Sequence, residues 1–483
     1  MFFYTENKID ILLVVPQQSA ASRVLSISSG KTPPLGIGYI AGYLLKYGVK
    51  VKILDNDIEL LNDKAFSNLV KKLNPRYVGF SVTTNSFNNA LHLASMIKEV
   101  DKSIKVIFGG VHPSALPESV LMFDSVDIVV KGEGEETTLE LLNALNEKSD
   151  LSRVKGIIYK QNGRTIINPD RELIKDIDNL PFPAYHLLPM GKYYFPASRR
   201  ITNKKIATII TGRGCIYNCS FCSHNVIFKK KLRLRSPENV LEEIKYLVHK
   251  YKVGEFLIWD DCFTLDEERA IKICRLIRKN RLNIKWSCSS RVDRASDKLY
   301  HELYLAGCRE LLFGAESGSQ YILDSIKKGI TLPQIESAVK LSKKYKIVSF
   351  CSFIFGTPEE TRETILETLN FVKKINPNYA IFCLLVPFPG SELFNQAVNN
   401  GLLDTRNANW DDYLSLFSTS FPPVMMCKLS GQELVSWQKK AFREFYFRPN
   451  YILKQLFFSN NIKHLYELYR GFMAIVKYQT TRF

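Results

Sequence analysis

The chain contains two runs of alternating strand-like and helix-like segments, and this alternation restricts its possible folds more than any other feature. Continuous apolar segments such as Ile11 to Val15 are typical of parallel strands buried on both faces, and helical patterns of crossover length separate them. The alternation predicts an α/β fold in which helices cover parallel sheets. Because 483 residues exceed what one hydrophobic core usually holds, more than one domain is expected.

The first run predicts a doubly wound, Rossmann-like sheet over residues 1–150. A hairpin closed by Asn162-Gly163 and a proline-rich stretch from Leu180 to Pro196 follow, and together they predict a connecting segment over residues 151–200. The predicted strands of the sheet are Ile11 to Val15, Lys50 to Leu54, Tyr77 to Val82, Lys105 to Gly110 and Val126 to Lys131.

The second run predicts six strand–helix units over residues 201–392, fewer than the eight of a closed barrel. We therefore expect an open, partial (β/α)6 barrel with its active site at the carboxyl ends of the strands, followed by a helical region over residues 393–483. The predicted strands are Ile206 to Thr211, Glu255 to Asp261, Ile284 to Ser290, Glu310 to Glu316, Ser349 to Gly356 and Tyr379 to Pro387.

Three cysteines, Cys215, Cys219 and Cys222, lie in the loop that directly follows the first barrel strand. Three thiolates at this spacing can hold one [4Fe-4S] cubane and leave its fourth iron without a protein ligand, open to the amino and carboxylate groups of a small molecule. A zinc site is the alternative. His224 would be its fourth ligand, although a position two residues beyond Cys222 is close for a tetrahedral site.

This loop, with the aromatic Phe221 directly before its last cysteine, resembles that of the radical S-adenosylmethionine superfamily. The resemblance implies that the three cysteines hold a [4Fe-4S] cluster that reductively cleaves S-adenosylmethionine to a 5′-deoxyadenosyl radical. It also implies one S-adenosylmethionine contact in the loop and others at the ends of successive strands. These are Phe221, Ile354 and Gly356 near the adenine, Asp260 and Asp261 at the amino group, Ser289 and Arg291 at the carboxylate, and Glu316 at the ribose.

A simpler role is open to the acidic residues of this set. Asp260, Asp261 and Glu316 would also suit the first turns of the helices that follow them, where carboxylates accept hydrogen bonds from free backbone amides. The sequence assigns no residue as a general acid or base.

A doubly wound sheet ahead of such a barrel resembles the cobalamin-binding domain of the cobalamin-dependent branch of this superfamily. Small residues at the strand ends would let a corrin approach the backbone. No Asp-x-His-x-x-Gly motif is present to mark a lower cobalt ligand; His112 either faces the corrin or is structural, and a sheet that binds nothing is the simpler alternative. The expected cobalamin contacts are Gly36, Gly38, Ser81, Thr83, Gly109, Gly110, His112, Gly132 and Glu133.

The formal charge of +18 is compatible with nucleic acid, a membrane surface or an anionic substrate as partner. No nucleic-acid-binding motif accompanies the charge, so the sequence disfavours that partner. From Lys428 onward basic residues are interleaved with aromatic ones. This predicts either helices that contact a membrane periphery or a lipid-like substrate, or a helical cap packed on the barrel. Dispersed cysteines and the lack of a secretory or membrane-spanning segment predict a cytoplasmic protein.

The leading hypothesis is an enzyme that methylates an unactivated carbon of a small-molecule or lipid-like substrate, using a [4Fe-4S] cluster, S-adenosylmethionine and cobalamin. The resemblance implies that the radical removes a substrate hydrogen, that cobalamin supplies the methyl group, and that a flavodoxin- or ferredoxin-type donor supplies electrons. A cobalamin-dependent cyclase or rearrangement enzyme and a non-catalytic iron–sulfur or cobalamin sensor are the alternatives. A methylthiotransferase is disfavoured, because the sequence has neither a second three-cysteine motif in the first domain nor a terminal RNA-binding module.

Overall fold

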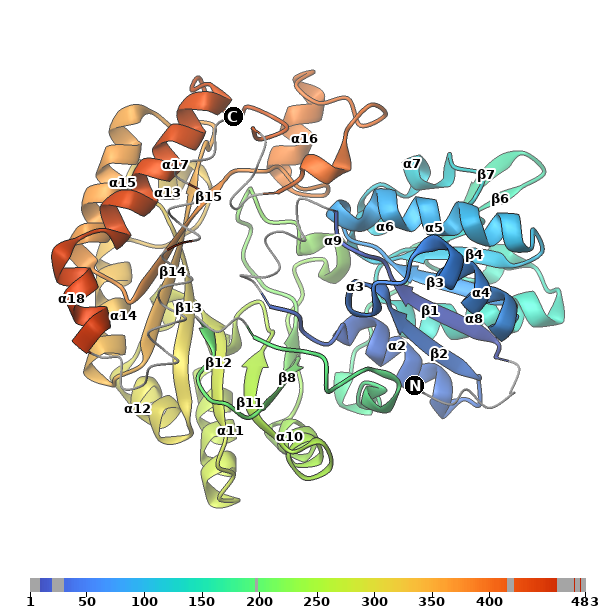
Figure 1. The fold of residues 1–483 in the computed structure, drawn as a ribbon, viewed down its shortest axis with the longest axis horizontal. Helices are drawn as coiled ribbons and strands as arrows, with labels where there is room; N and C mark the ends of the chain where they lie inside the picture. The colour runs from blue at the N-terminus through green and yellow to red at the C-terminus, as the bar shows by residue number, and fades with distance from the viewer. Residues whose placement is uncertain are drawn as a thin grey trace.

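Two α/β units lie side by side in the computed structural model, which describes residues 9–19, 30–195, 199–414, 421–457, 473 and 478 (Figure 1). The first unit is built on a seven-stranded sheet and the second on a six-stranded one. Both runs of alternating strands and helices are therefore confirmed as parallel-stranded layers.

The first sheet has the strand order β2-β1-β3-β4-β5-β6-β7. Strands β1 to β5 pair in parallel, whereas β6 and β7 form an antiparallel hairpin that continues the sheet from β5. The strands are β1 (Ile11–Val15), β2 (Val51–Asp55), β3 (Tyr77–Ser81), β4 (Lys105–Gly109), β5 (Ile128–Val130), β6 (Ile157–Gln161) and β7 (Arg164–Ile167).

The hairpin is thus hydrogen-bonded to the first unit, although the sequence places it in the connecting segment. Ile128 of β5 pairs with Tyr159 of β6, so the outer edge of β5 is covered instead of being left open.

Helices cover both faces of the first sheet. Apolar residues of α2 and α8 pack on one face, and those of α4 and α5 pack on the other. The helices are α2 (Leu35–Lys46), α3 (Asn56–Glu59), α4 (Asp63–Leu73), α5 (Phe87–Val100), α6 (Val111–Ala115), α7 (Pro117–Leu121) and α8 (Gly134–Glu147).

The second sheet has the order β15-β14-β13-β12-β11-β8, and all neighbouring strands are parallel. The predicted six-stranded partial barrel is confirmed, and Figure 1 shows its helices α10 to α15 on the outer side, away from the first unit, whereas α16 lies toward that unit. The strands are β8 (Lys205–Ile209), β11 (Val253–Ile258), β12 (Lys285–Ser290), β13 (Cys308–Glu316), β14 (Val348–Phe355) and β15 (Tyr379–Leu384). The helices are α10 (Pro237–Tyr251), α11 (Glu267–Lys279), α12 (Asp297–Leu305), α13 (Gln320–Ser325), α14 (Leu332–Lys344), α15 (Arg362–Ile375) and α16 (Glu392–Asn399).

The C-terminal region packs on both units. Helix α17 (Gly431–Tyr446) lies against β15, where Phe442 and Phe445 bury their rings against Phe382, with centroids 5.3 and 6.4 Å apart. The chain before it crosses to the first unit, whose core includes Trp410 and Tyr413. A helical cap on the barrel is therefore confirmed for α17; α18 (Pro449–Phe457) follows it, and residues 458–472 lie outside the described part.

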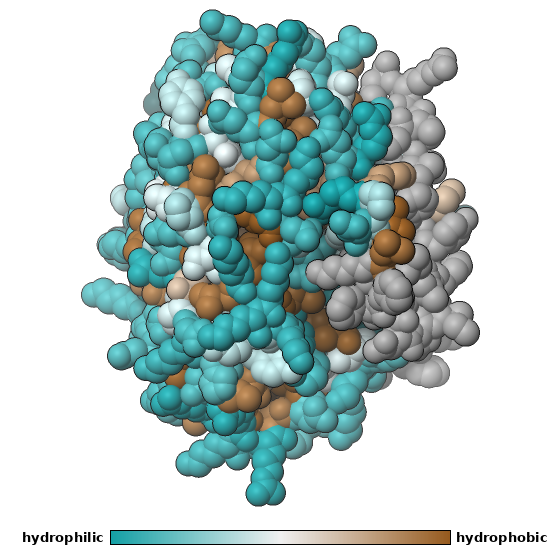
Figure 2. Space-filling model, turned by 90° about the vertical axis from the view of Figure 1, so that its left-hand side faces the viewer, coloured by the Kyte–Doolittle hydropathy of each residue, from teal (hydrophilic) through white to brown (hydrophobic). Residues whose placement is uncertain are grey.

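Among the described residues, no helix combines the length and the apolar content needed to cross a membrane. Figure 2 shows the outer face of the molecule on the barrel side, where hydrophilic residues predominate and apolar residues form small scattered patches.

Candidate active site

The cysteine loop leaves the barrel through a two-stranded ladder. Strand β9 (Gly212–Arg213) pairs with β10 (Arg233–Leu234), and the short helix α9 (Asn225–Phe228) lies between them. Gly214, at the start of the loop, has φ +89°, and a Cβ there would lie 2.1 Å from the carbonyl oxygen of Lys231. Only glycine fits where the backbone at Gly214 approaches Lys231 so closely, and this approach brings the two ends of the loop together.

The three thiols of the loop are half-buried, and none of them forms a disulfide in the described structure. Burial raises the pKa of all three cysteines, that of Cys215 to about 11. A bound metal centre is therefore needed to hold them as thiolates at neutral pH.

His224, the fourth ligand of the alternative zinc site, packs back on the loop. Its Nε2 lies 2.9 Å from the carbonyl oxygen of Cys215, and its Nδ1 lies 3.3 Å from Sγ of Cys222. Because the carbonyl can only accept, Nε2 carries the proton. Among the described residues, no three His, Cys, Asp or Glu side chains are grouped as ligands of a single metal ion.

A buried ion pair lies at the end of β13. Nζ of Lys328 donates to Oε1 of Glu316 at 2.6 Å and lies 5.7 Å from the ring centroid of Phe221. Burial alone would lower the pKa of Lys328, but Glu316 raises it above its usual value, so the ammonium stays charged. A Cβ on Gly314 would lie 2.2 Å from Oε1 of Glu316, which explains why this strand position is glycine.

Glu316 itself has φ +64°, a left-handed conformation that costs a non-glycine residue on the order of 1 kcal/mol. The β13–β14 register shifts between Gly314 and Glu316. This local distortion turns the carboxylate toward Lys328 instead of continuing the strand.

The guanidinium of Arg291 stacks on the ring of Tyr217 in the cysteine loop, with Cζ 3.4 Å from the ring centroid. Its Nε donates to Asp293 at 2.9 Å, and its Nη2 donates to the carbonyl oxygens of Lys328 and Gly329 at 3.0 and 3.3 Å. Arg291 therefore joins the cysteine loop to the segment that carries Lys328.

The two aspartates at the end of β11 differ in their surroundings. Asp260 is buried and accepts from both the backbone NH and the hydroxyl of Thr211, whereas Asp261 is exposed and accepts from the backbone of Gly214. Burial raises the pKa of the Asp260 carboxyl. Neither caps α11, which begins after Asp266, and α13 begins after Ser319, not Glu316. The capping alternative is therefore wrong for these acids.

Ser289, Ile354 and Gly356 lie at the carboxyl ends of β12 and β14, as predicted. Ser289 and Ile354 are half-buried, while Phe353 and Phe355 on the other face of β14 are fully buried in the barrel core. Gly356 has φ +92° and lies beneath Leu434 of α17.

The carboxyl edge of the first sheet is lined by small residues. Gly36 and Gly132 have nothing within 4 Å of a would-be Cβ, so the space beside them is open. Ser81, Thr83 and Gly109 lie at the same edge.

Two of the glycines predicted to contact cobalamin, Gly38 and Gly110, lie close against neighbouring segments of the chain. A Cβ on Gly110 would lie 2.7 Å from the carbonyl oxygen of Val82, and one on Gly38 would lie 3.0 Å from Cβ of Pro183. Gly38 therefore lets the proline-rich segment approach α2.

The carboxyl edges of the two sheets meet. Helix α6, which follows β4, contacts α9, which follows the cysteine loop, and the two lie beside one another in Figure 1. Gly390, after β15, approaches both helices, since its would-be Cβ is 2.0 Å from Val226 and 3.6 Å from Ala115. A ligand at either edge is therefore near the other.

Comparisons with known proteins agree with this arrangement. The chain matches the B12 binding domain over residues 24–142 and the radical SAM superfamily over residues 209–372. It is 37% identical to an uncharacterized methyltransferase of Pyrococcus horikoshii, over 92% of this chain and 94% of the relative. It is 31% identical to the anaerobic magnesium-protoporphyrin IX monomethyl ester cyclase of Rubrivivax gelatinosus, over 76% and 67% of the two chains.

This chain belongs to the cobalamin-dependent radical S-adenosylmethionine enzymes. Its fold is that of the radical S-adenosylmethionine methyltransferase TsrM from Kitasatospora setae, solved with cobalamin and a [4Fe-4S] cluster bound. The TM-score is 0.67 at 19% identity, covering 89% of this chain and 81% of that chain. The cofactors of this enzyme are a [4Fe-4S] cluster, S-adenosylmethionine and cobalamin.

The residues at the barrel edge fit the first two cofactors of a radical S-adenosylmethionine enzyme. Three disulfide-free thiols on one closed loop suit three irons of the cubane. The charged groups of Glu316 and Asp261 suit the ribose hydroxyls and amino group of the adenosyl donor, as predicted for them, and Lys328 adds a positive charge beside Glu316. These individual contacts remain predictions.

The residues at the edge of the first sheet fit the corrin of a cobalamin-dependent enzyme, because Gly36 and Gly132 leave room for a wide macrocycle. His112 is instead buried between Phe87 and Trp410, with ring centroids 4.4 and 4.9 Å away. Its Nε2 has no hydrogen-bond partner among the described residues, and burial lowers the pKa of its imidazole to about 3. The carboxylate of Glu133 accepts hydrogen bonds from two arginines of the barrel unit, Arg213 and Arg233.

Sequence reasoning did not find Lys328 or Arg213 in this radical S-adenosylmethionine enzyme. Lys328 lies in a short segment between α13 and α14 that matches no motif. Arg213 stands two residues before Cys215, and this position beside the cysteine loop was the signal available in the sequence.

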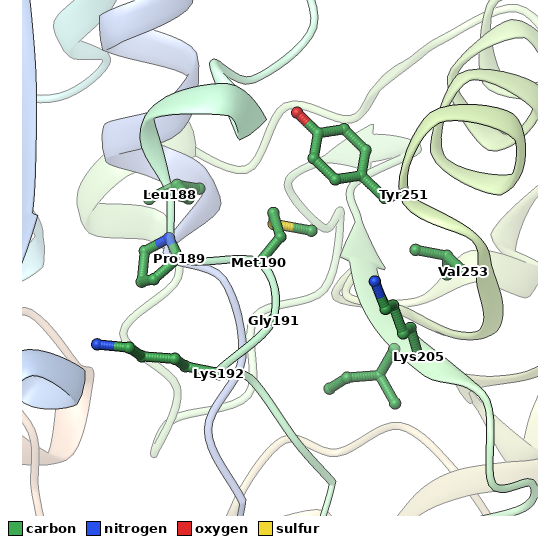
Figure 3. Close-up of a pocket in the computed structure, with 9 residues that line it drawn as sticks. Leu188, Pro189, Met190, Gly191, Lys192, Lys205, Tyr251 and Val253 are labelled. Carbon is green, nitrogen blue, oxygen red and sulfur yellow. The ribbon is translucent and has the colours of Figure 1, made fainter. Parts of the chain in front are cut away.

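A cavity of about 330 Å³ lies at the other end of the barrel of this enzyme, beside the first residues of β8 and β11. Figure 3 shows Lys205 and Tyr251 on its barrel side and the segment from Leu188 to Lys192 across from them. It faces away from the carboxyl edges, where the cofactor-binding residues lie.

Proposed function

We propose that this chain is a methyltransferase that adds a methyl group to an unactivated carbon of a small-molecule substrate. The contact of α6 with α9 carries the proposal, because it brings the carboxyl edge of the first sheet, open at Gly36 and Gly132, to the cysteine loop of the second. When bound, the cluster and S-adenosylmethionine supply a 5′-deoxyadenosyl radical that removes a hydrogen atom from the substrate, and cobalamin supplies the methyl group.

The residues of the chain hold and orient these reactants. Cys215, Cys219 and Cys222 would each bind one iron of the cluster. Lys328 and Glu316 would fix the adenosyl donor by charge and hydrogen bonds, and Arg291 would keep the cysteine loop in place through Tyr217. The α17 cap over β15 would help to exclude water from the radical.

A cyclase is the second candidate, and the Rubrivivax gelatinosus cyclase relative favours it. The methyltransferase relative from Pyrococcus horikoshii has the higher identity and covers more of this chain, and this supports methylation. A cyclase would use the same cofactors but would add no carbon to its substrate.

The wider setting of the reaction is part of the proposal. A flavodoxin- or ferredoxin-type protein would reduce the cluster, and the charge of +18 would attract such an acidic donor. We propose a cytoplasmic location; peripheral contact with a membrane, or with a lipid-like substrate, would involve the basic and aromatic residues after Lys428, many of which lie outside the described part.

The test uses anaerobically reconstituted protein, cobalamin, a strong reductant and S-adenosylmethionine with a deuterated methyl group, incubated with a small-molecule extract of the source cells. The proposal expects a product heavier by one deuterated methyl group. A product that gains no label while losing hydrogen would establish the cyclase instead. Protein that never yields 5′-deoxyadenosine would indicate a sensor.

A further inference from the structure

Four charged side chains join the first unit to the base of the cysteine loop. Arg213 donates from Nη1 to Oε1 of Glu133 and from Nη2 to Oε1 of Glu135, both at 2.6 Å. Arg233, which pairs with Arg213 across the β9–β10 ladder, donates from Nη1 to Oε2 of Glu133 at 2.6 Å. We call these four residues the interdomain ion cluster.

The interdomain ion cluster is buried and electrically balanced. The side chains of Glu133 and Glu135 are 4% exposed and those of Arg213 and Arg233 are 8% and 10% exposed. Burial alone would raise the pKa of Glu133, but the two arginines hold it below its usual value. Two carboxylates and two guanidinium groups cancel, so the loss of one charge leaves another buried without a partner.

The arginines of the interdomain ion cluster lie beside the cysteine loop, and its glutamates lie at the carboxyl edge of the first sheet. The arginines lie at both ends of the cysteine loop, since Arg213 precedes Cys215 by two residues and Arg233 follows α9. The glutamates lie at the N-cap and in the first turn of α8, directly after Gly132 at the carboxyl edge of the first sheet. The start of α8 is thus joined by ion pairs to β9 and β10, the two strands that flank the cysteine loop.

Other contacts make this connection stiff. Arg213 lies over the ring of Tyr39 in α2, with Cζ 5.0 Å from its centroid. Glu133 also accepts from the backbone NH of Ile174, and Arg233 donates to the carbonyl oxygen of the same residue at 2.7 Å. Glu133 accepts from both arginines and Arg213 donates to both glutamates, so several charged hydrogen bonds connect the start of α8 to the base of the cysteine loop.

We propose that the interdomain ion cluster sets the position of the cobalamin edge relative to the [4Fe-4S] cluster. Its four members are positioning residues for methyl transfer, and Glu133 acts through Arg213 and Arg233 instead of contacting cobalamin. This inference rests on the proposed function. If the interdomain ion cluster is weakened, cleavage of S-adenosylmethionine should continue, while the rate of methyl transfer to the substrate should decrease.

The experiment compares wild-type holoenzyme with Glu135→Gln, which keeps the shape of the side chain and removes its charge. Electron paramagnetic resonance measures the magnetic interaction between cob(II)alamin and the reduced cluster, and hence the distribution of distances between them. We expect one narrow distribution in the wild type and a broader one in the variant. The ratio of 5′-deoxyadenosine to methylated product should rise, by roughly 10²-fold for a displacement of about 1 Å.

Two further variants keep the test decisive. Lys229→Met removes the pair of Lys229 with Asp170, whose side chains are 45% and 48% exposed, and should leave both readouts unchanged. Arg213→Lys keeps the charge but replaces the two Nη donors that bond to Glu133 and Glu135 with a single ammonium, and should fall between the wild type and Glu135→Gln.

An unchanged distance distribution in both Glu135→Gln and Arg213→Lys would overturn the inference. If the wild type made no methylated product while the distribution still broadened in Glu135→Gln, the proposed function would fail and the positioning role would stand. If Glu135→Gln does not fold, Arg213→Lys alone decides: a wild-type distribution refutes the role and a broader one supports it.

Discussion

The carboxyl edges of the two sheets differ in chemistry, although both are built from parallel strands. The barrel edge carries thiols and paired charges, with Lys328 bonded to Glu316 and Arg291 stacked on the cysteine loop. The edge of the first sheet has open space at Gly36 and Gly132, and the glutamates beside it, Glu133 and Glu135, are already paired with arginines. From this difference we expect the barrel to bind its small, charged cofactor by specific bonds, and the first sheet to admit a wide macrocycle by leaving room for it.

The largest expected effect comes from removing a cluster ligand at the barrel edge. Cys219→Ala should lose most of the bound iron, and cleavage of S-adenosylmethionine to 5′-deoxyadenosine should fall below detection, because two thiolates cannot hold the cubane. Iron analysis and chromatography of the products measure both. Cys427→Ser, outside the loop, should keep its iron; a Cys219→Ala protein that still makes 5′-deoxyadenosine would refute the ligand assignment.

Lys328→Met tests whether the charges of the barrel edge bind the adenosyl donor. The variant loses a charged hydrogen-bond donor, which is worth about 1.5–3 kcal/mol, so affinity for S-adenosylmethionine should fall roughly 10–100-fold. Equilibrium dialysis measures the affinity. Lys327→Met removes the neighbouring, half-exposed lysine and should have little effect. Equal affinities of the Lys328→Met variant and the wild type would place the donor elsewhere.

The same variant leaves Glu316 buried without its partner, which should lower the free energy of unfolding by about 3–5 kcal/mol. Denaturant titration measures this. Adding Glu316→Gln to Lys328→Met removes the unpaired charge and should restore part of the loss. A double variant no more stable than Lys328→Met would show that the two side chains do not act as a pair.

Gly36→Leu tests the open edge of the first sheet by filling it. Because nothing lies near the would-be Cβ of Gly36, the larger side chain should fold without a clash and weaken cobalamin binding about tenfold, roughly 1.4 kcal/mol. Absorbance titration measures the affinity. Gly36→Ala is the matched control, since it should bind cobalamin normally and stabilise α2 by about 0.5–1 kcal/mol. Unchanged binding in Gly36→Leu would move the corrin away from α2.

The smallest effect concerns His112. Burial lowers its pKa to about 3 in the folded protein, so only the unfolded chain takes up this proton as the pH falls below about 6.5. Stability should therefore decrease on the acid side, and His112→Phe should remove about 0.7 kcal/mol of the decrease between about pH 7 and pH 6. Equal pH dependence of His112→Phe and wild type would contradict the burial of a neutral imidazole.

Local patterns predicted the strands and the cysteine loop well, because continuous apolar segments and ligand spacing are short-range properties of the chain. The hairpin of β6 and β7 was recognisable, but its pairing with β5 was not, since an exposed edge is created only when the sheet forms. Likewise, Glu133 meets Arg213 only after both units fold, so its glycine-rich surroundings suggested a ligand contact instead of an ion pair.

The two site predictions differ for the same reason. The sequence singled out Glu316 because it ends a strand with a recognisable motif, and its contact with the ribose stays a prediction, whereas Lys328 reaches it from a segment without a motif. His112 follows a strand end as a corrin contact would, yet Trp410, from a distant part of the chain, covers it. Long-range packing, which the sequence pattern does not encode locally, decided these cases.

The account claims that both edges serve one methyl transfer, and product stoichiometry with and without cobalamin tests this claim most directly. With substrate present, the complete holoenzyme should form 5′-deoxyadenosine and S-adenosylhomocysteine in equal amounts, and omission of cobalamin should abolish S-adenosylhomocysteine and the methylated product together. Formation of 5′-deoxyadenosine and a methylated product that did not depend on cobalamin would contradict it.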